Sequence, residues 1–253
     1  MVADYTAHFE SLVSSPRLER YRPPNRDDLE TVVNYLWNVA LSEALLQGLS
    51  AVEIGLRNSV HKTLTTELGT EYWFWPFLYP EDLDHFNREW IKLRKSVAGR
   101  PSPGKVVANQ TFGFWNRVFQ TRYDDFWSAN ALRLLWSVFP YHPRKGIPPA
   151  DWLTRNKIAN HTKLFVDLRN RVMHHEPIFQ GIARPDELQR NKPMPIVSLA
   201  AAHNQMRTLL GWIDPQLLGT LDIVDRFPDI HSGGKIRIES DLRNEIIRIH
   251  GHL

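Results

Sequence analysis

The sequence predicts an all-α protein, and three observations lead to that class. Apolar residues recur every three or four positions over long stretches, most clearly between residues 29 and 64. No stretch shows the alternation of apolar and polar residues, punctuated by turns, that is typical of strands. Stretches rich in proline and glycine are short and fall between the helical segments. We therefore expect helices packed as a bundle with short connections.

Residues 29–64 predict one long helix, or two helices joined near Gly48. Two adjoining apolar stripes run along it: Leu29, Val33, Trp37, Leu41, Leu45 and Leu49; then Leu36, Ala40, Ala44, Gly48, Val52, Leu56, Val60 and Leu64. Glu53, Arg57 and His61 follow one another at four-residue steps and so share one face. We interpret them as a polar ladder that ties the helix to its neighbours. The alternative is that Glu53 or Arg57 orients a catalytic histidine from across the bundle.

Further helices are predicted on both sides of this one. A short helix is expected within residues 1–26, and Asn25 or Asp27 is expected to cap the long helix. The other expected helical ranges are 81–96, 109–120, 124–139, 150–176, 196–212, 214–226 and a tail from Glu239, with loops at 98–105, 140–149 and 185–195. The aromatic stretch 71–80 is interpreted as a loop pinned against the core, with stacking on unpaired bases as the alternative.

Length and composition fit one domain that spans residues 1–253. We place its motif-bearing core at about 27–180 and a helical C-terminal extension at 181–253. Of the 253 residues, 42% are hydrophobic, which is enough to bury a sizeable core. There is no cysteine, so disulfides and thiolate zinc sites are excluded. Neither a signal segment nor an apolar run long enough to cross a bilayer is recognised, and we expect a cytoplasmic protein without membrane contact.

Positive charge is modest overall and concentrated in one region. The net charge of +3 is compatible with RNA binding, but many proteins that bind no nucleic acid have the same excess. Basic residues gather between positions 88 and 105, where candidate RNA-phosphate contacts are Lys92, Arg94, Lys95, Arg100 and Lys105. The alternative is that this run is a solvated helix face.

The richest chemistry lies in residues 168–177, which read LRNRVMHHEP. Pro177 blocks further helix, so the two histidines are expected near a helix C-terminus, where the helix dipole favours protonated imidazole. Asn170 and His174 lie one turn apart on one face, whereas Arg169 and His174 are about 140° apart around the axis. Histidine, arginine and amide together can cleave a phosphodiester without metal, provided that a ribose 2′-hydroxyl is the nucleophile.

Three stretches of the chain resemble the Abi-like (abortive infection) proteins of the HEPN superfamily. The segment LRNRVMHHEPIF, residues 168–179, is similar to their signature, an arginine and a polar residue followed by a histidine after four to six residues. Residues 35–38 leading through 52–58, and residues 111–115, also match. Together the stretches cover roughly residues 30 to 180. Met173 departs from the smaller residue that often precedes the histidine in that family, which changes packing without removing an ionisable group.

The resemblance implies a HEPN-like helical bundle with peripheral helices and a metal-independent endoribonuclease activity without cofactor. It implies a toxin or abortive-infection effector in phage defence, a homodimer with two facing motifs, and an antitoxin or other neutralising protein. On this basis His174 is general acid or base, Arg169 stabilises the pentavalent phosphate, and Asn170 holds the imidazole or the substrate. Auxiliary candidates are Arg171, His175, Glu176, Glu53 and Arg57.

Several alternatives remain open. The pair Arg243 and His250 also satisfies the arginine-to-histidine spacing, whereas Arg57 and His61 are too close. A zinc site could use histidines 142, 161, 174 and 175 with Asp167 or Glu176, but the spaced pairs typical of such sites are missing. No phosphate loop, dinucleotide fingerprint or serine elbow occurs. A non-enzymatic alternative is a catalytically inactive module of the same fold that binds RNA or nucleotide, or that forms a dimer.

Overall fold

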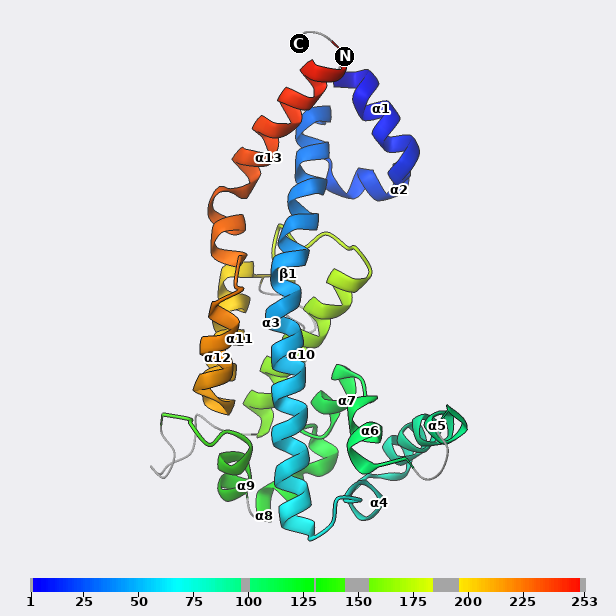
Figure 1. Ribbon diagram of the computed structural model, residues 1–253, viewed down its shortest axis with the longest axis vertical. Coiled ribbons are helices and arrows are strands. Elements are labelled where there is room, and N and C mark those ends of the chain that lie inside the picture. The colour runs from blue at the N-terminus through cyan, green and yellow to red at the C-terminus, as the bar shows by residue number, and fades with distance from the viewer. Residues whose placement is uncertain (1, 97–100, 130, 144–154, 184–195, 251–253) are drawn as a thin grey trace, which may run out of the picture. The chain divides into compact units, whose positions relative to one another are not determined.

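The computed structural model describes residues 2–96, 101–129, 131–143, 155–183 and 196–250 (Figure 1). It is 79% helical, which confirms the all-α class. The larger α-helices are α1 (Val2–Val13), α3 (Asp28–Leu68), α5 (Pro80–Ser96), α10 (Arg155–Met173), α11 (Leu199–Ile213) and α13 (Phe227–His250). Shorter ones are α2 (Ser15–Leu18), α4 (Phe74–Phe77), α6 (Pro103–Ala108), α7 (Phe112–Arg117), α8 (Asp124–Ala129), α9 (Ala131–Val138) and α12 (Pro215–Asp222), with 3₁₀ turns η1 (Glu19–Tyr21) and η2 (Thr121–Tyr123).

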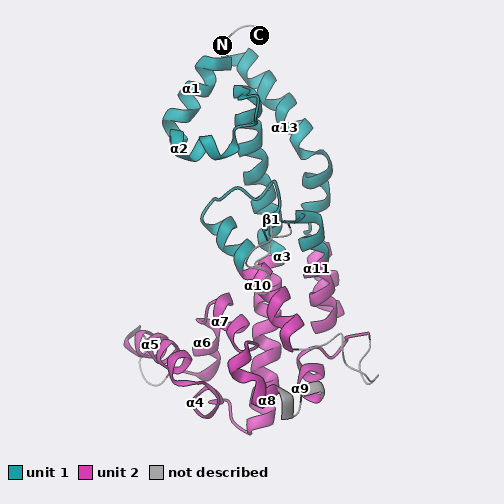
Figure 2. Ribbon diagram, turned by 180° about the vertical axis from the view of Figure 1, so that it is seen from behind, with its two compact units in different colours: residues 1–48, 167–204, 223–253 teal, residues 49–166, 205–222 magenta. Residues whose placement is uncertain are grey.

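The chain divides into two compact units, each built from separate stretches of sequence (Figure 2). Unit 1 comprises residues 1–48, 167–204 and 223–253, and unit 2 comprises residues 49–166 and 205–222. Helices α3, α10 and α11 each contribute residues to both units. The division does not follow the expected boundary at residue 180, and the single-domain assignment stays a prediction.

The long helix forms as one element, because α3 continues through Gly48 without a break. Its start is capped as predicted: the Asp27 carboxylate accepts a hydrogen bond from the Glu30 backbone N–H at 2.6 Å. Gly69 follows the last helical residue with a φ of +65°, the left-handed conformation that ends many helices. The apolar stripes therefore outweigh the weak helix propensity of the glycines inside the segment.

Unit 1 has its core where both ends of the chain meet α3. Leu29, Val32 and Val33 of α3 are buried against Leu242 and Ile246 of α13. Partly buried side chains from α1, α3 and α13 pack around them: Val2, Tyr5, Phe9, Leu36 and Ile238. Figure 1 shows α1 and α13 on either side of the start of α3, with the two termini close together. Helices α1 and α13 thus both pack against the first turns of α3.

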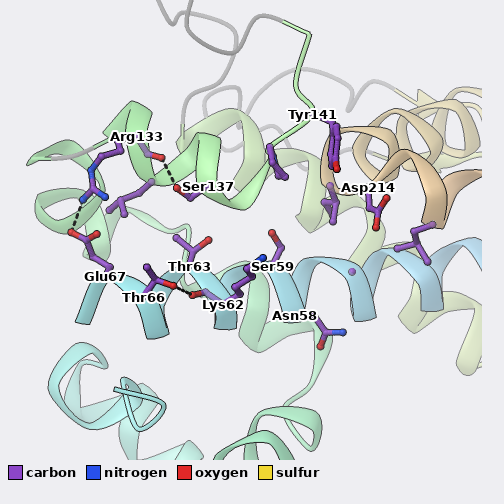
Figure 3. Close-up of a pocket in the computed structure, with 15 residues that line it drawn as sticks. Asn58, Ser59, Lys62, Thr63, Thr66, Glu67, Arg133, Ser137, Tyr141 and Asp214 are labelled. Carbon is purple, nitrogen blue, oxygen red and sulfur yellow. Dashed lines mark hydrogen bonds and ion pairs between the residues drawn. The ribbon is translucent and has the colours of Figure 1, made fainter. Parts of the chain in front are cut away.

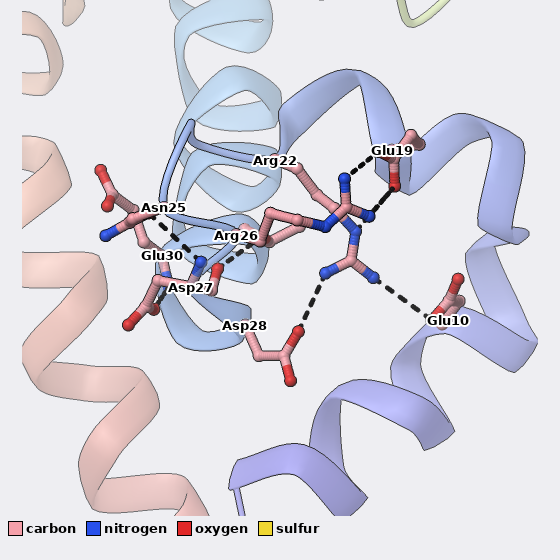
Figure 4. A network of polar contacts seen from close by, with 9 residues as sticks. Glu10, Glu19, Arg22, Asn25, Arg26, Asp27, Asp28 and Glu30 are labelled. Atoms are coloured by element: carbon pink, nitrogen blue, oxygen red, sulfur yellow. Dashed lines mark hydrogen bonds and ion pairs between the residues drawn. The ribbon is translucent and has the colours of Figure 1, made fainter.

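A charged network fastens the turn before α3 (Figure 4). The Arg22 guanidinium lies 2.8 Å from a Glu19 carboxylate oxygen, 2.9 Å from Asp28 and 3.7 Å from Glu10. Its side chain is 15% exposed, so solvent screens these contacts less than it screens surface ion pairs. Arg26 forms a second, exposed pair with Glu19 at 3.0 Å. The network joins the ends of α1 and η1 to the first turn of α3.

Unit 2 has an aromatic core. Trp73, Phe74, Phe86, Phe114 and Trp115 are fully buried and contact one another in stacked and edge-to-face pairs. The core interpretation of the aromatic stretch 71–80 therefore holds for Trp73, Phe74 and Phe77, which are buried, whereas the expectation of a loop was wrong for α4, Phe74–Phe77. The side chains of Trp75 and Tyr79, however, are exposed.

Three further expectations about elements were wrong. The tail helix begins at Phe227 rather than near Glu239, and α13 therefore includes Gly233 and Gly234. The loop expected at 98–105 ends early, because Pro103 starts α6 and proline fits the first helical turn. Strands were not expected, yet β1 (Ile182–Ala183) and β2 (Ile196–Val197) form an antiparallel pair with Ile182 opposite Val197.

The expectation that the chain contains no apolar run long enough to cross a bilayer was wrong for one helix. By length and composition alone, α3 could cross a membrane. In its most apolar window, 44% of the residues are buried inside the protein. A helix at the centre of a folded core can have the same length and composition, so these two properties alone do not identify α3 as a membrane span.

Candidate functional site

The predicted motif lies at the C-terminal end of α10. The helix buries one stripe along its length, formed by Ile158, Leu164, Phe165, Leu168 and Val172. The predicted helix 150–176 ends close to the observed end, whereas its expected start falls in residues 144–154, outside the described part. Both histidines follow the last helical residue, Met173.

The helix ends in a Schellman turn centred on the histidine pair. The Glu176 N–H donates to the Arg171 carbonyl at 2.8 Å, and the His175 N–H donates to the Val172 carbonyl at 3.2 Å. His175 takes the left-handed conformation with a φ of +53°, at a position where glycine is usual. A non-glycine residue in this conformation is strained, and such strain is common at functional sites. The turn fixes the backbone that carries His174.

The side chains of the motif face solvent. Asn170, His174 and His175 are exposed, and Arg169 and Arg171 are partly exposed. The His174 N–H donates to the Asn170 carbonyl at 2.9 Å, which keeps these two residues one turn apart on one face, as predicted. Within the described ranges, none of these five side chains makes a hydrogen bond or ion pair. They are available to a ligand or to another protein surface.

The ion pair of Glu176 contributes little to the stability of the turn. Its carboxylate lies 4.0 Å from the Arg20 guanidinium, and the two side chains are 38% and 55% exposed. Exposed pairs at this distance stabilise proteins weakly.

A buried asparagine holds the loop that follows the motif. The Asn38 side chain, on α3, donates to the Glu176 carbonyl at 3.2 Å and accepts from the backbone N–H groups of Ile178 at 2.7 Å and Phe179 at 3.2 Å. It also donates to the Tyr21 hydroxyl at 3.2 Å, so both ends of the amide are satisfied. Asn38 is 2% exposed. It connects α3 directly to the segment that leaves the histidines.

Tyr21 contacts the same loop, and we call Asn38 and Tyr21 together the clamp. Its hydroxyl donates to the His175 carbonyl at 3.3 Å, and its ring stacks on Phe179 at 5.8 Å between centroids. Burial, reinforced by the neighbouring Tyr35, raises the pKa of Tyr21 above its ordinary value. The hydroxyl therefore keeps its proton at neutral pH and remains a donor.

Asn38 lies in a stretch that resembles the family, but no role is predicted from the sequence for it or for Tyr21. A signal was present: Asn34 and Asn38 are polar residues one turn apart in an apolar segment, and both are buried. Asn34 donates to the Tyr21 carbonyl at 3.0 Å. Buried amides in a helix need partners outside it, so this spacing predicts side-chain bonds to a packed loop.

The polar ladder on α3 makes structural contacts within unit 2. The Arg57 guanidinium donates to the Ala108 carbonyl at 3.3 Å, and Trp73 Nε1–H donates to His61 Nδ1 at 2.7 Å. Burial lowers the pKa of His61, and Glu71 opposes this shift. Glu53 is partly exposed and also has an interaction partner. These contacts support the interpretation that the ladder ties α3 to its neighbours.

The predicted RNA-binding residues lie on α5 and α6. Lys92, Arg94 and Lys95 are exposed on α5, and Lys105 is exposed in the first turn of α6. The Lys92 amine pairs with the Glu89 carboxylate at 2.5 Å, which reduces its availability. Arg100 lies outside the described residues.

Two competing sites lose support. Arg243 forms an ion pair with Glu239 at 2.7 Å, one turn away on α13, which accounts for the arginine of the Arg243 and His250 pair. Within the part of the chain that the structure describes, no three histidine or carboxylate side chains are grouped to hold a metal ion. His142, proposed for the zinc alternative, is buried with its ring 4.4 Å from that of Trp212.

No family model, no curated protein and no solved structure matches this chain.

Proposed function

We propose that the chain is a metal-independent endoribonuclease of the HEPN type, with its reactive groups at the end of α10. The observation that carries the proposal is the exposed set of Arg169, Asn170 and His174, which has no competing partner in the described residues. Side chains that only stabilise a fold are normally paired or packed. Three unpaired groups suited to phosphoryl chemistry on a fixed turn favour a role toward a ligand.

The chemistry needs only these groups and the substrate. His174 imidazole takes the proton of a ribose 2′-hydroxyl, whose oxygen attacks the neighbouring phosphorus, or it protonates the departing 5′-oxygen. Arg169 stabilises the negative charge that develops on the phosphoryl oxygens. Asn170, one turn before His174, orients the imidazole or the substrate. The products are a 2′,3′-cyclic phosphate and a 5′-hydroxyl.

The exposure of His174 favours action as a homodimer. A general acid or base works best where water is excluded, and an exposed helix end does not exclude it. A second copy placed against this surface would cover the histidines and add a second Arg169. This explains how groups about 140° apart around one helix could serve one phosphate. Lys92, Arg94, Lys95 and Lys105 are proposed to bind the RNA backbone.

The family resemblance extends the proposal to biology. It suggests a toxin or abortive-infection effector that cleaves cellular RNA during phage infection, restrained by a neutralising protein.

The test is cleavage of total RNA by purified protein in the presence of EDTA. The wild type should cleave, and His174→Ala should lose at least about 100-fold in rate, the usual contribution of acid–base catalysis. The matched control is His8→Ala, which removes an exposed histidine of α1 and should cleave like the wild type. Equal cleavage by all three proteins would overturn the assignment of His174.

A second candidate function is RNA binding or dimer formation without catalysis. It is favoured by the absence, among the described residues, of a carboxylate or carbonyl that fixes the His174 tautomer. In this case the wild type and His174→Ala would bind RNA equally and neither would cleave it.

A further inference from the structure

Unit 2 contains a polar cavity that the proposed cleavage reaction does not use (Figure 3). Its volume is about 640 Å³, within the usual range of about 300–1,000 Å³ for small-molecule sites. The floor is one face of α3, the roof is α9 with Tyr141, and one end is closed by the start of α12. All of its lining residues belong to unit 2.

Close packing at one end keeps the cavity walls in place. A β-carbon at Gly55 would lie 3.1 Å from the Leu217 side chain of α12, so glycine permits α12 to approach α3. Tyr141 is held through its backbone, whose N–H donates to the Trp212 carbonyl at 3.0 Å. The cavity is therefore built by packed helices and a fixed turn.

Most polar groups of the cavity already have partners. Arg133 and Glu67 form an ion pair at 2.6 Å and neutralise each other. The hydroxyls of Ser59, Thr66 and Ser137 donate to helix carbonyls, which leaves only their acceptor capacity. These groups shape the walls rather than attract a charged ligand.

Two groups on the floor remain without partners. Thr63 is 5% exposed and lines the cavity, yet its hydroxyl makes no hydrogen bond within the described ranges. Figure 3 shows it between α3 and α9, turned toward the open space. The hydroxyl oxygen itself is accessible from the cavity, where it can donate a hydrogen bond to a ligand or accept one. The neighbouring Lys62 amine is exposed and makes no ion pair among the described residues.

The end of the cavity next to α12 offers an aromatic ring and a carboxylate. Tyr141 is 58% exposed, which is high for an aromatic side chain beside a cavity. One oxygen of Asp214 accepts the Gln216 N–H at 2.8 Å and caps α12, and the other oxygen remains an acceptor. An aromatic face binds flat rings, and a carboxylate accepts hydrogen bonds from amines or sugar hydroxyls.

We propose that this cavity binds a free nucleoside monophosphate. Lys62 and the Thr63 hydroxyl would hold the phosphate, Tyr141 would stack on the base, and Asp214 would accept from the sugar or the base. A lone anion would use only Lys62 and Thr63, and a neutral ring would use only Tyr141. The nucleotide engages both ends of the cavity. The site is separate from His174 and does not depend on cleavage there.

Calorimetric titration of the full chain with AMP, GMP, CMP and UMP tests the proposal. At least one nucleotide should bind saturably, whereas adenosine, inorganic phosphate and ribose 5-phosphate should bind at least about tenfold more weakly, since each lacks at least one of the proposed contacts. His174→Ala should bind like the wild type, so failure of the proposed cleavage leaves this result intact.

Three variants locate the binding. Lys62→Met and Tyr141→Leu should each weaken binding about tenfold, and Thr63→Val, which keeps the side-chain shape, about fivefold. Lys62→Arg should restore most of the affinity. Arg237→Met, which removes one exposed charge from α13, is the matched control and should bind normally.

Three results would overturn the proposal. One is no saturable binding of any mononucleotide by folded wild-type protein at about 5 mM. Another is binding that is unchanged in Lys62→Met and Thr63→Val. The third is binding of RNA oligonucleotides but of no mononucleotide, which would indicate that the cavity contacts an RNA chain.

Discussion

At the residue scale, Asn38 determines where the histidine turn lies relative to α3. Its amide bonds to the backbone of three residues in the segment 176–179, about 140 residues away in the sequence. No local pattern could reveal those partners, because they come together only when α3 and the end of α10 pack. The Schellman turn is different, since Pro177 predicted the end of the helix from a local steric rule.

Asn38→Ala should lower the free energy of unfolding by about 2–4 kcal/mol, because it leaves buried backbone groups of the loop without partners. Denaturant unfolding measures the loss, and limited proteolysis should show faster cutting after Met173. The control is Asn109→Ala, whose exposed side chain bonds only to the Lys105 carbonyl. It should change stability by less than about 0.5 kcal/mol. Equal effects of the two variants would show that the clamp does not stabilise the fold.

His61 gives unit 2 a pH-dependent stability. Burial lowers its pKa below the ordinary 6.5, so the unfolded chain binds the proton more readily than the folded chain. The stabilisation is present above about pH 6.5 and is lost as the pH falls through the folded-state pKa. The Tm of the wild type should therefore drop more between pH 7 and pH 5 than that of His61→Gln. His8→Gln should keep the wild-type slope, and a wild-type slope in His61→Gln would contradict the assignment.

At the element scale, a helix was predicted more accurately where its apolar residues recur more regularly. The apolar stripes of α3 predicted a long helix, and its glycines did not interrupt it. In α13 the adjacent Gly233 and Gly234 concealed the first half of the helix. A β-carbon at Gly234 would be in ordinary van der Waals contact with the Trp37 indole, at 3.5 Å, so this position lies where α13 packs on α3. This packing of α13 on α3 is a tertiary contact that periodicity does not contain.

Gly233→Ala tests whether α13 is continuous. Nothing lies within 4 Å of a β-carbon at this position, so alanine should stabilise the helix by about 0.5–1 kcal/mol. Gly69→Ala is the comparison: it also has open space, but its φ of +65° should make alanine destabilising by about 1 kcal/mol. Denaturant midpoints measure both. A neutral or destabilising Gly233→Ala would indicate that residues 227–238 are not helical.

At the scale of the whole molecule, we propose that the ribonuclease acts as a dimer. The candidate residues are recognisable in the sequence because they cluster within ten positions, and the structure brings Asn170 and His174 to one exposed face. In the proposed dimer, Arg169 of a second copy would join them. The dimer is thus the step that the family resemblance suggests and that no pattern within the chain could predict.

Metal-free cleavage by His174 is tested most directly by end-group analysis of RNA fragments made by the wild type in EDTA, with His174→Ala alongside. The wild type should leave 2′,3′-cyclic phosphate and 5′-hydroxyl ends and the variant should leave no such fragments, because the proposed nucleophile is the 2′-hydroxyl and His174 moves its proton. Fragments with 5′-phosphate and 3′-hydroxyl ends, or the same cyclic ends from His174→Ala, would contradict this mechanism.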